Sequence, residues 1–88
     1  MNFTESQSKK VRAKIKSTYG KLKSFANAAG LQDYQVSRHL SGQEMDIMIY
    51  IKYLILLGFI PAKKNYIVPW SDYETFARLN KLPLKIKF

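Results

Sequence analysis

Apolar residues recur at helical spacing near the start of this chain. Val11, Ile15 and Tyr19 follow one another every four residues, which places them on one face of a helix. Lysines and an arginine occupy the other faces of the same stretch. The pattern predicts a helix over residues 9–19, preceded by a polar, flexible segment at residues 1–8.

The next stretch, residues 22–42, predicts two short helices joined by a tight turn. The first helix ends at Gly30, where a residue without a side chain can take a positive φ at little cost. The second is expected over residues 34–40, with Val36 and Leu40 on its inner face. The small side chain of Ala26 permits the two helices to cross closely.

The most apolar part of the chain, residues 47–60, predicts the central helix of the fold. Asp46 is placed to cap this helix, and the helix is expected to end near Leu57. Lys52 interrupts the run, which is far shorter than the roughly 20 residues needed to cross a bilayer. We therefore expect a buried core helix and no membrane span.

The last third of the sequence changes character. Residues 66–68 are typical of an extended segment, and Ser71 with Glu74 fits a capping box that opens a fifth helix ending near Lys81. Residues 84–88 alternate apolar and basic side chains, the pattern of a half-buried strand. The expected fold is thus mainly α: a compact bundle of four to five helices containing a helix-turn-helix, with short extended C-terminal segments.

Composition narrows the functional classes. The 88 residues suffice for one small domain, and 15 Lys and Arg against 6 Asp and Glu give a net charge of +9. This charge favours a polyanionic partner, nucleic acid before an anionic membrane surface. The absence of cysteine excludes disulfides and thiolate zinc sites, and a single histidine offers no catalytic pair. We therefore expect no enzymatic activity, cofactor or metal. We also expect a cytoplasmic location, since no signal peptide is visible.

Leu22 to Gly42 carries a more specific signal. Ala26, the Gly30-Leu31 turn, Val36 and Leu40 fall where small, glycine and aliphatic residues stand in the helix-turn-helix regulators of the Cro and lambda-repressor type, common in phages and plasmids. The chain resembles that family over residues 9–60. The resemblance implies a DNA-binding domain whose second short helix lies in the major groove.

The resemblance also implies which side chains meet DNA. Arg38 is suited to guanine and Gln35 to adenine, each contact contributing about 1–3 kcal/mol of discrimination. Asp33 is expected to cap its helix; accepting a hydrogen bond from cytosine is the alternative. The expected base contacts are Tyr34, Gln35 and Arg38, the base or phosphate contacts are Gln32, Asp33 and Ser37, and the phosphate contacts are Lys21 and Lys23.

Residues 61–88 form an expected C-terminal extension rich in aromatic residues. We predict that it pairs two copies of the chain, although the same residues would alternatively complete the core of one copy. The expected interface residues are Tyr66, Trp70, Phe76, Ile86 and Phe88.

The functional hypothesis is a small repressor that binds double-stranded DNA as a homodimer on a palindromic operator. The alternatives are an excisionase-like factor that bends DNA, and an antitoxin or other module that grips a protein partner through the aromatic C-terminal third.

Overall fold

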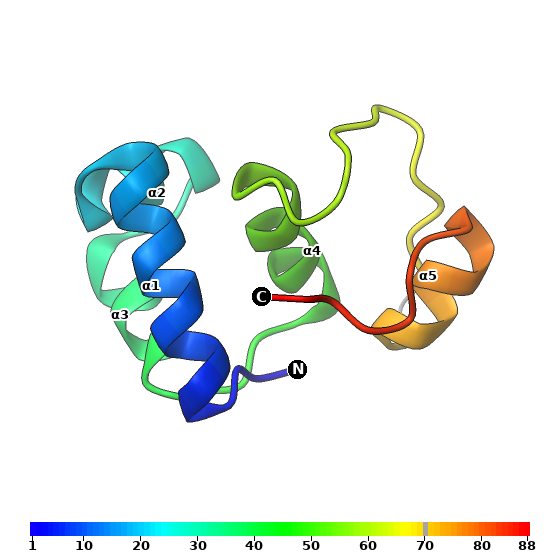
Figure 1. Cartoon of the computed structure of the whole chain (residues 1–88), viewed down its shortest axis with the longest axis horizontal. Helices are drawn as coiled ribbons and strands as arrows, with labels where there is room; N and C mark the ends of the chain where they lie inside the picture. The colour runs from blue at the N-terminus through cyan, green and yellow to red at the C-terminus, as the bar shows by residue number, and fades with distance from the viewer. Residues whose placement is uncertain (70) are drawn as a thin grey trace.

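The helix Ile47–Leu56, labelled α4, lies in the middle of the molecule, as its apolarity predicts (Figure 1). The computed structural model describes residues 1–69 and 71–88 of the chain. In chain order, the helices are α1 (Glu5–Tyr19), α2 (Leu22–Ala29), α3 (Asp33–Leu40), α4 (Ile47–Leu56) and α5 (Tyr73–Asn80). The described residues contain no strand, so the prediction of a small, mainly helical bundle is confirmed.

The core is built from aromatic rings supplied by several elements. Tyr53 of α4 is fully buried, with the rings of Phe3 and Phe25 centred 5.3 and 5.0 Å from its own. Val11 and Ile15 of α1 are buried as the sequence spacing predicts. Figure 1 shows α1, α2 and α3 grouped on one side of α4, with α5 on the other side. The first three helices also contact one another directly, and α2 contacts α4, so the four pack together as one unit.

Two of the predicted cap residues stand at the starts of α4 and α5. Asp46 caps α4 as expected, since its Oδ1 accepts a hydrogen bond from the Ile49 N–H at 2.9 Å. At α5 the predicted Ser71 cap is wrong: the neighbouring Asp72 accepts from the Thr75 N–H at 2.7 Å. The helix therefore starts at Tyr73, and the capping hydrogen bonds hold the pKa of Asp72 below its usual value.

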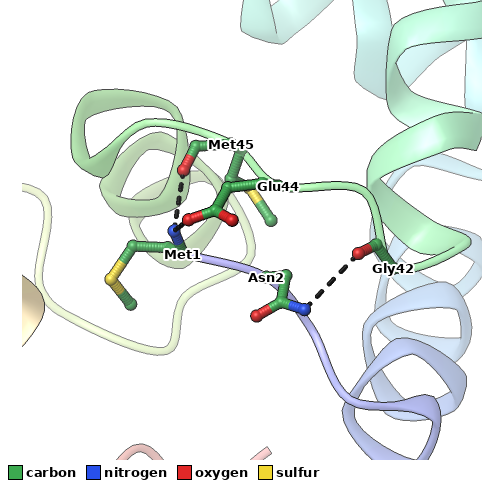
Figure 2. A network of polar contacts seen from close by, with 5 residues as sticks. All are labelled: Met1, Asn2, Gly42, Glu44 and Met45. Atoms are coloured by element: carbon green, nitrogen blue, oxygen red, sulfur yellow. Dashed lines mark hydrogen bonds and ion pairs between the residues drawn. The ribbon is translucent and has the colours of Figure 1, made fainter.

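The N-terminal segment is more structured than its polarity predicts. Thr4 and Gln7 form a reciprocal capping box, so α1 begins at Glu5 and not at Lys9. Phe3 is 2% exposed within the aromatic core. Figure 2 shows this segment beside the loop after α3, where the Met1 amino group donates to Met45 O and to Glu44 Oε1, each at 3.0 Å. The expectation of a flexible segment at residues 1–8 is therefore not met.

The chain after α4 crosses to α5 through a long loop, and the segment at residues 66–68, predicted to be extended, belongs to no strand. The side-chain amide of Asn80 forms the two backbone hydrogen bonds that a neighbouring strand would otherwise form with Ile67. Its Oδ1 accepts from the Ile67 N–H at 2.9 Å, and its Nδ2 donates to Ile67 O at 2.7 Å. Both backbone polar groups of Ile67 are thus satisfied within the chain.

Residues 82–88 return from α5 toward α1 and α4 and end between them in the view of Figure 1. The ring of Phe88 meets Phe59 at 5.0 Å and Phe3 at 5.9 Å. The Tyr73 hydroxyl donates to Pro83 O at 3.0 Å, which ties the start of this tail to α5. The expected strand at residues 84–88 is wrong, because no ladder forms: Phe88 packs on aromatic rings of the core, and Leu84 stays 48% exposed.

Candidate nucleic-acid interface

The helix α3 has one buried face and one exposed face. Val36 and Leu40 are 0% and 4% exposed, as the sequence predicts, and Tyr34 and Arg38 are on the solvent side. Ala26 of α2 is fully buried and α2 contacts α3 directly. A helix anchored on one side by close-packed aliphatic residues presents the other side in a fixed orientation.

The turn between α2 and α3 is closed by backbone and side-chain hydrogen bonds. Gly30 adopts the left-handed conformation with φ of 70°, and the next residue, Leu31, donates its N–H to Ala26 O at 2.9 Å. The Nζ of Lys52, from α4, donates to Ala29 O at 3.0 Å. Lys52 thus caps the C-terminus of α2, where a cation is favoured by the helix dipole. The polar interruption in the apolar run 47–60 was the sequence signal for this contact.

The exposed face of α3 carries an aromatic–guanidinium pair. Tyr34 is 57% exposed, and the guanidinium carbon of Arg38 lies 5.2 Å from the centre of its ring. The two residues are one helical turn apart, so their side chains meet on the same face. Because a cation over an aromatic ring is attracted by its π electrons, Tyr34 favours an outward position for Arg38 with its hydrogen-bond donors directed to solvent.

The start of α3 differs from the prediction. Gln32 occupies the N-cap position, and its backbone N–H donates to Gln35 Oε1 at 2.8 Å. Asp33 is the first residue of the helix and not its cap, so the prediction of an Asp33 cap is wrong. Its exposed carboxylate is still favoured there by the helix dipole. Gln35 is half-buried with its oxygen engaged, so a two-bond contact with adenine would have to share that oxygen.

A buried polar pair lies behind α3. His39 is 7% exposed, and its Nδ1 lies 3.0 Å from the Tyr53 hydroxyl. Burial lowers the pKa of His39, an effect that the nearby negative charge of Asp46 partly offsets, and burial raises the pKa of Tyr53. Both groups are therefore neutral near pH 7, and the pair joins α3 to the central helix. The sequence contains no sign of this pair, because the two residues lie 14 positions apart in different helices.

Exposed basic residues lie along α1 and at the start of α2. Lys21 precedes α2 as its N-cap residue and makes no side-chain capping bond, and Lys23 is exposed in its first turn. The backbone N–H groups at this helix start have a positive potential that favours anions. The exposed basic residues of α1 extend the charge: Lys9, Lys10, Arg12, Lys14 and Lys16.

The residues predicted to form a dimer interface are mostly used inside the chain. Phe76 is fully buried, and Tyr66 packs on it with ring centres 5.3 Å apart while its hydroxyl donates to Pro61 O. Phe88 fills the aromatic contact described above, and Ile86 packs against the core. The prediction for Phe76 is therefore wrong, since burial in its own core leaves no surface for a second copy. Trp70 lies outside the described residues.

Within residues 1–69 and 71–88, no group of three or more His, Asp or Glu side chains is arranged to hold a metal ion. None of the helices over these residues has both the length and the apolarity to span a bilayer. The features that remain distinctive are the exposed face of α3 and the surrounding positive charge.

Comparison of the chain with family models, curated proteins and solved structures finds no match in any of the three.

Proposed function

We propose that this protein is a sequence-specific double-stranded DNA-binding regulator that inserts α3 into the major groove. The observation that carries the proposal is the outward Tyr34–Arg38 pair on a helix whose opposite face is buried through Val36 and Leu40. An α-helix with one free face fits the width of the major groove, and arginine is the residue best suited to guanine.

The charge of the chain supports the same partner. A net charge of +9 favours association with a phosphate backbone, and Lys21 and Lys23 stand at the start of the helix that precedes α3. Phosphate contacts at that point would fix the position of α3 relative to the bases. Gln32, Asp33 and Ser37 are exposed next to the pair and are the further candidates for contact with DNA.

We propose repression by occupancy of a promoter in a prokaryotic cytoplasm as the mode of action, since a protein bound over a promoter excludes a polymerase sterically. Pairing of two copies on a palindromic operator remains part of the proposal, although most of the expected interface residues serve the chain's own core. A second copy would have to use other exposed apolar residues, of which Leu79 and Leu84 are each 48% exposed.

Selection of bound duplexes from a random pool tests the proposal. We expect enrichment of a short motif containing guanine, with two-fold symmetry if two copies bind together. Retention of duplexes without any enriched motif would contradict the proposal, because it would mean that the positive charge alone holds the DNA.

A further inference from the structure

An open apolar groove lies between α4, the loop that follows it and the end of α2. Its volume is about 350 Å³, and none of the residues that line it belongs to α3. The loop arches away from the end of α4 toward α5 in Figure 1. The groove is therefore distinct from the proposed DNA-binding face.

The floor of the groove has the spacing of a helix-docking surface. Met48, Ile51 and Ile55 follow one another along α4 at intervals of three and four residues, and Val68 of the loop faces the same space. Met48 is 50% exposed, a large apolar side chain left without full cover. A stripe of this spacing packs well against the apolar face of another helix.

The remaining side chains of the groove select the charge of its occupant. Lys52, Lys63 and Lys64 line it and are exposed, and no acidic residue takes part. A second copy of this chain would bring three more lysines to the same place, which like-charge repulsion disfavours. A nucleic acid would satisfy the lysines but would leave the apolar floor unused. An occupant with both an apolar stripe and carboxylates satisfies every part of the groove.

We propose that this groove docks an acidic amphipathic helix of a partner protein. The helix presents apolar side chains at positions i, i+3, i+4 and i+7 to Met48, Ile51 and Ile55, and its flanking Asp or Glu side chains pair with Lys63 and Lys64. Lys52 keeps its bond to Ala29 O and has two further donors for a carboxylate. The interaction does not depend on DNA binding by α3.

Selection from a displayed library tests the proposal with the full chain as bait. The library holds random peptides of about 14 residues, long enough for roughly four helical turns. We expect the enriched peptides to be acidic, with apolar residues at helical spacing, and to shift the amide NMR signals of α4 and residues 63–68. Enrichment of basic or unpatterned peptides, or shifts confined to α3, would overturn the proposal.

Charge reversal provides the control. The variant Lys63→Glu/Lys64→Glu should bind the selected peptides at least about tenfold more weakly, since attraction becomes repulsion at the rim. The matched variant Lys9→Glu/Lys10→Glu makes the same charge change on exposed positions of α1 outside the groove and should bind within about twofold of the parent. If both variants bind the selected peptides equally weakly, net charge alone explains the effect, and the proposal of a specific binding groove is contradicted. A short DNA duplex is expected to displace the peptide only if both bind the same face. If the duplex displaces the peptide from the parent but not from an Arg38→Ala variant, the peptide binds the DNA face and the proposal is wrong.

Discussion

Arg38→Ala separates recognition of bases from the stability of the fold. The side chain is exposed and contacts the Tyr34 ring at 5.2 Å, an interaction that contributes about 0.5–1 kcal/mol at an exposed site. Its removal should therefore lower the free energy of unfolding by no more than about 1 kcal/mol. A lost two-bond contact with guanine costs about 1–3 kcal/mol of discrimination, which is about 5- to 150-fold in relative affinity. The variant should fold nearly as well as the parent while losing selectivity.

Fluorescence anisotropy with the selected duplex and a shuffled duplex measures that selectivity, and urea unfolding measures the stability. The matched control is Arg78→Ala, which removes the same charge from α5, where Arg78 pairs with Glu74 at 2.8 Å on an exposed surface. We expect the control to keep the ratio of the two affinities. If Arg38→Ala preserves the ratio as well, or if both variants lower it equally, Arg38 does not contact a base.

Three further changes have defined outcomes. Lys23→Ala should weaken binding to every duplex alike and lower the slope of log affinity against log salt by about 1, which a salt titration measures. Asp46→Ala should lower the free energy of unfolding by about 1 kcal/mol in urea, because the Ile49 N–H loses its cap. Burial lowers the pKa of His39 below 6.5, so the unfolded chain binds the proton more readily than the folded chain. The contribution of His39 to stability should be complete above pH 6.5 and should decrease as the pH falls below it. In His39→Gln, urea unfolding at several pH values should no longer show this dependence.

The helical part of the fold followed from apolar spacing because each helix buries one stripe of residues. Val11, Ile15, Val36 and Leu40 were all predicted to face inward and all do so. Asp46 was identified as a cap because its carboxylate can accept a hydrogen bond from the unpaired backbone N–H groups at the start of the helix that follows it. Such local rules act within one or two turns of helix and are visible in the sequence.

The errors arose where contacts between distant parts of the chain override local pattern. Phe3 joins an aromatic cluster that no local rule connects to Tyr53, so the N-terminal segment was predicted to be flexible. Phe88 likewise packs on Phe59, which holds the end of the alternating tail against the core. The side chain of Asn80 bonds to the backbone of Ile67, in the segment predicted to be extended. At α3, cap propensity favours Asp33, but the cap is the preceding residue, Gln32. The side chain of Gln35 accepts from the Gln32 N–H, a contact that propensity does not include.

Affinity cleavage of DNA from a single position on α3 is the most direct measurement of where that helix binds. The chain contains no cysteine, so Ser37→Cys provides one site for an iron chelate on the exposed face of α3. We expect strand cuts at fixed positions inside the selected motif, and no localised cuts from the same chelate at Arg78→Cys on α5. Cuts spread evenly along the duplex, or the same pattern from both positions, would contradict the insertion of α3 into the major groove.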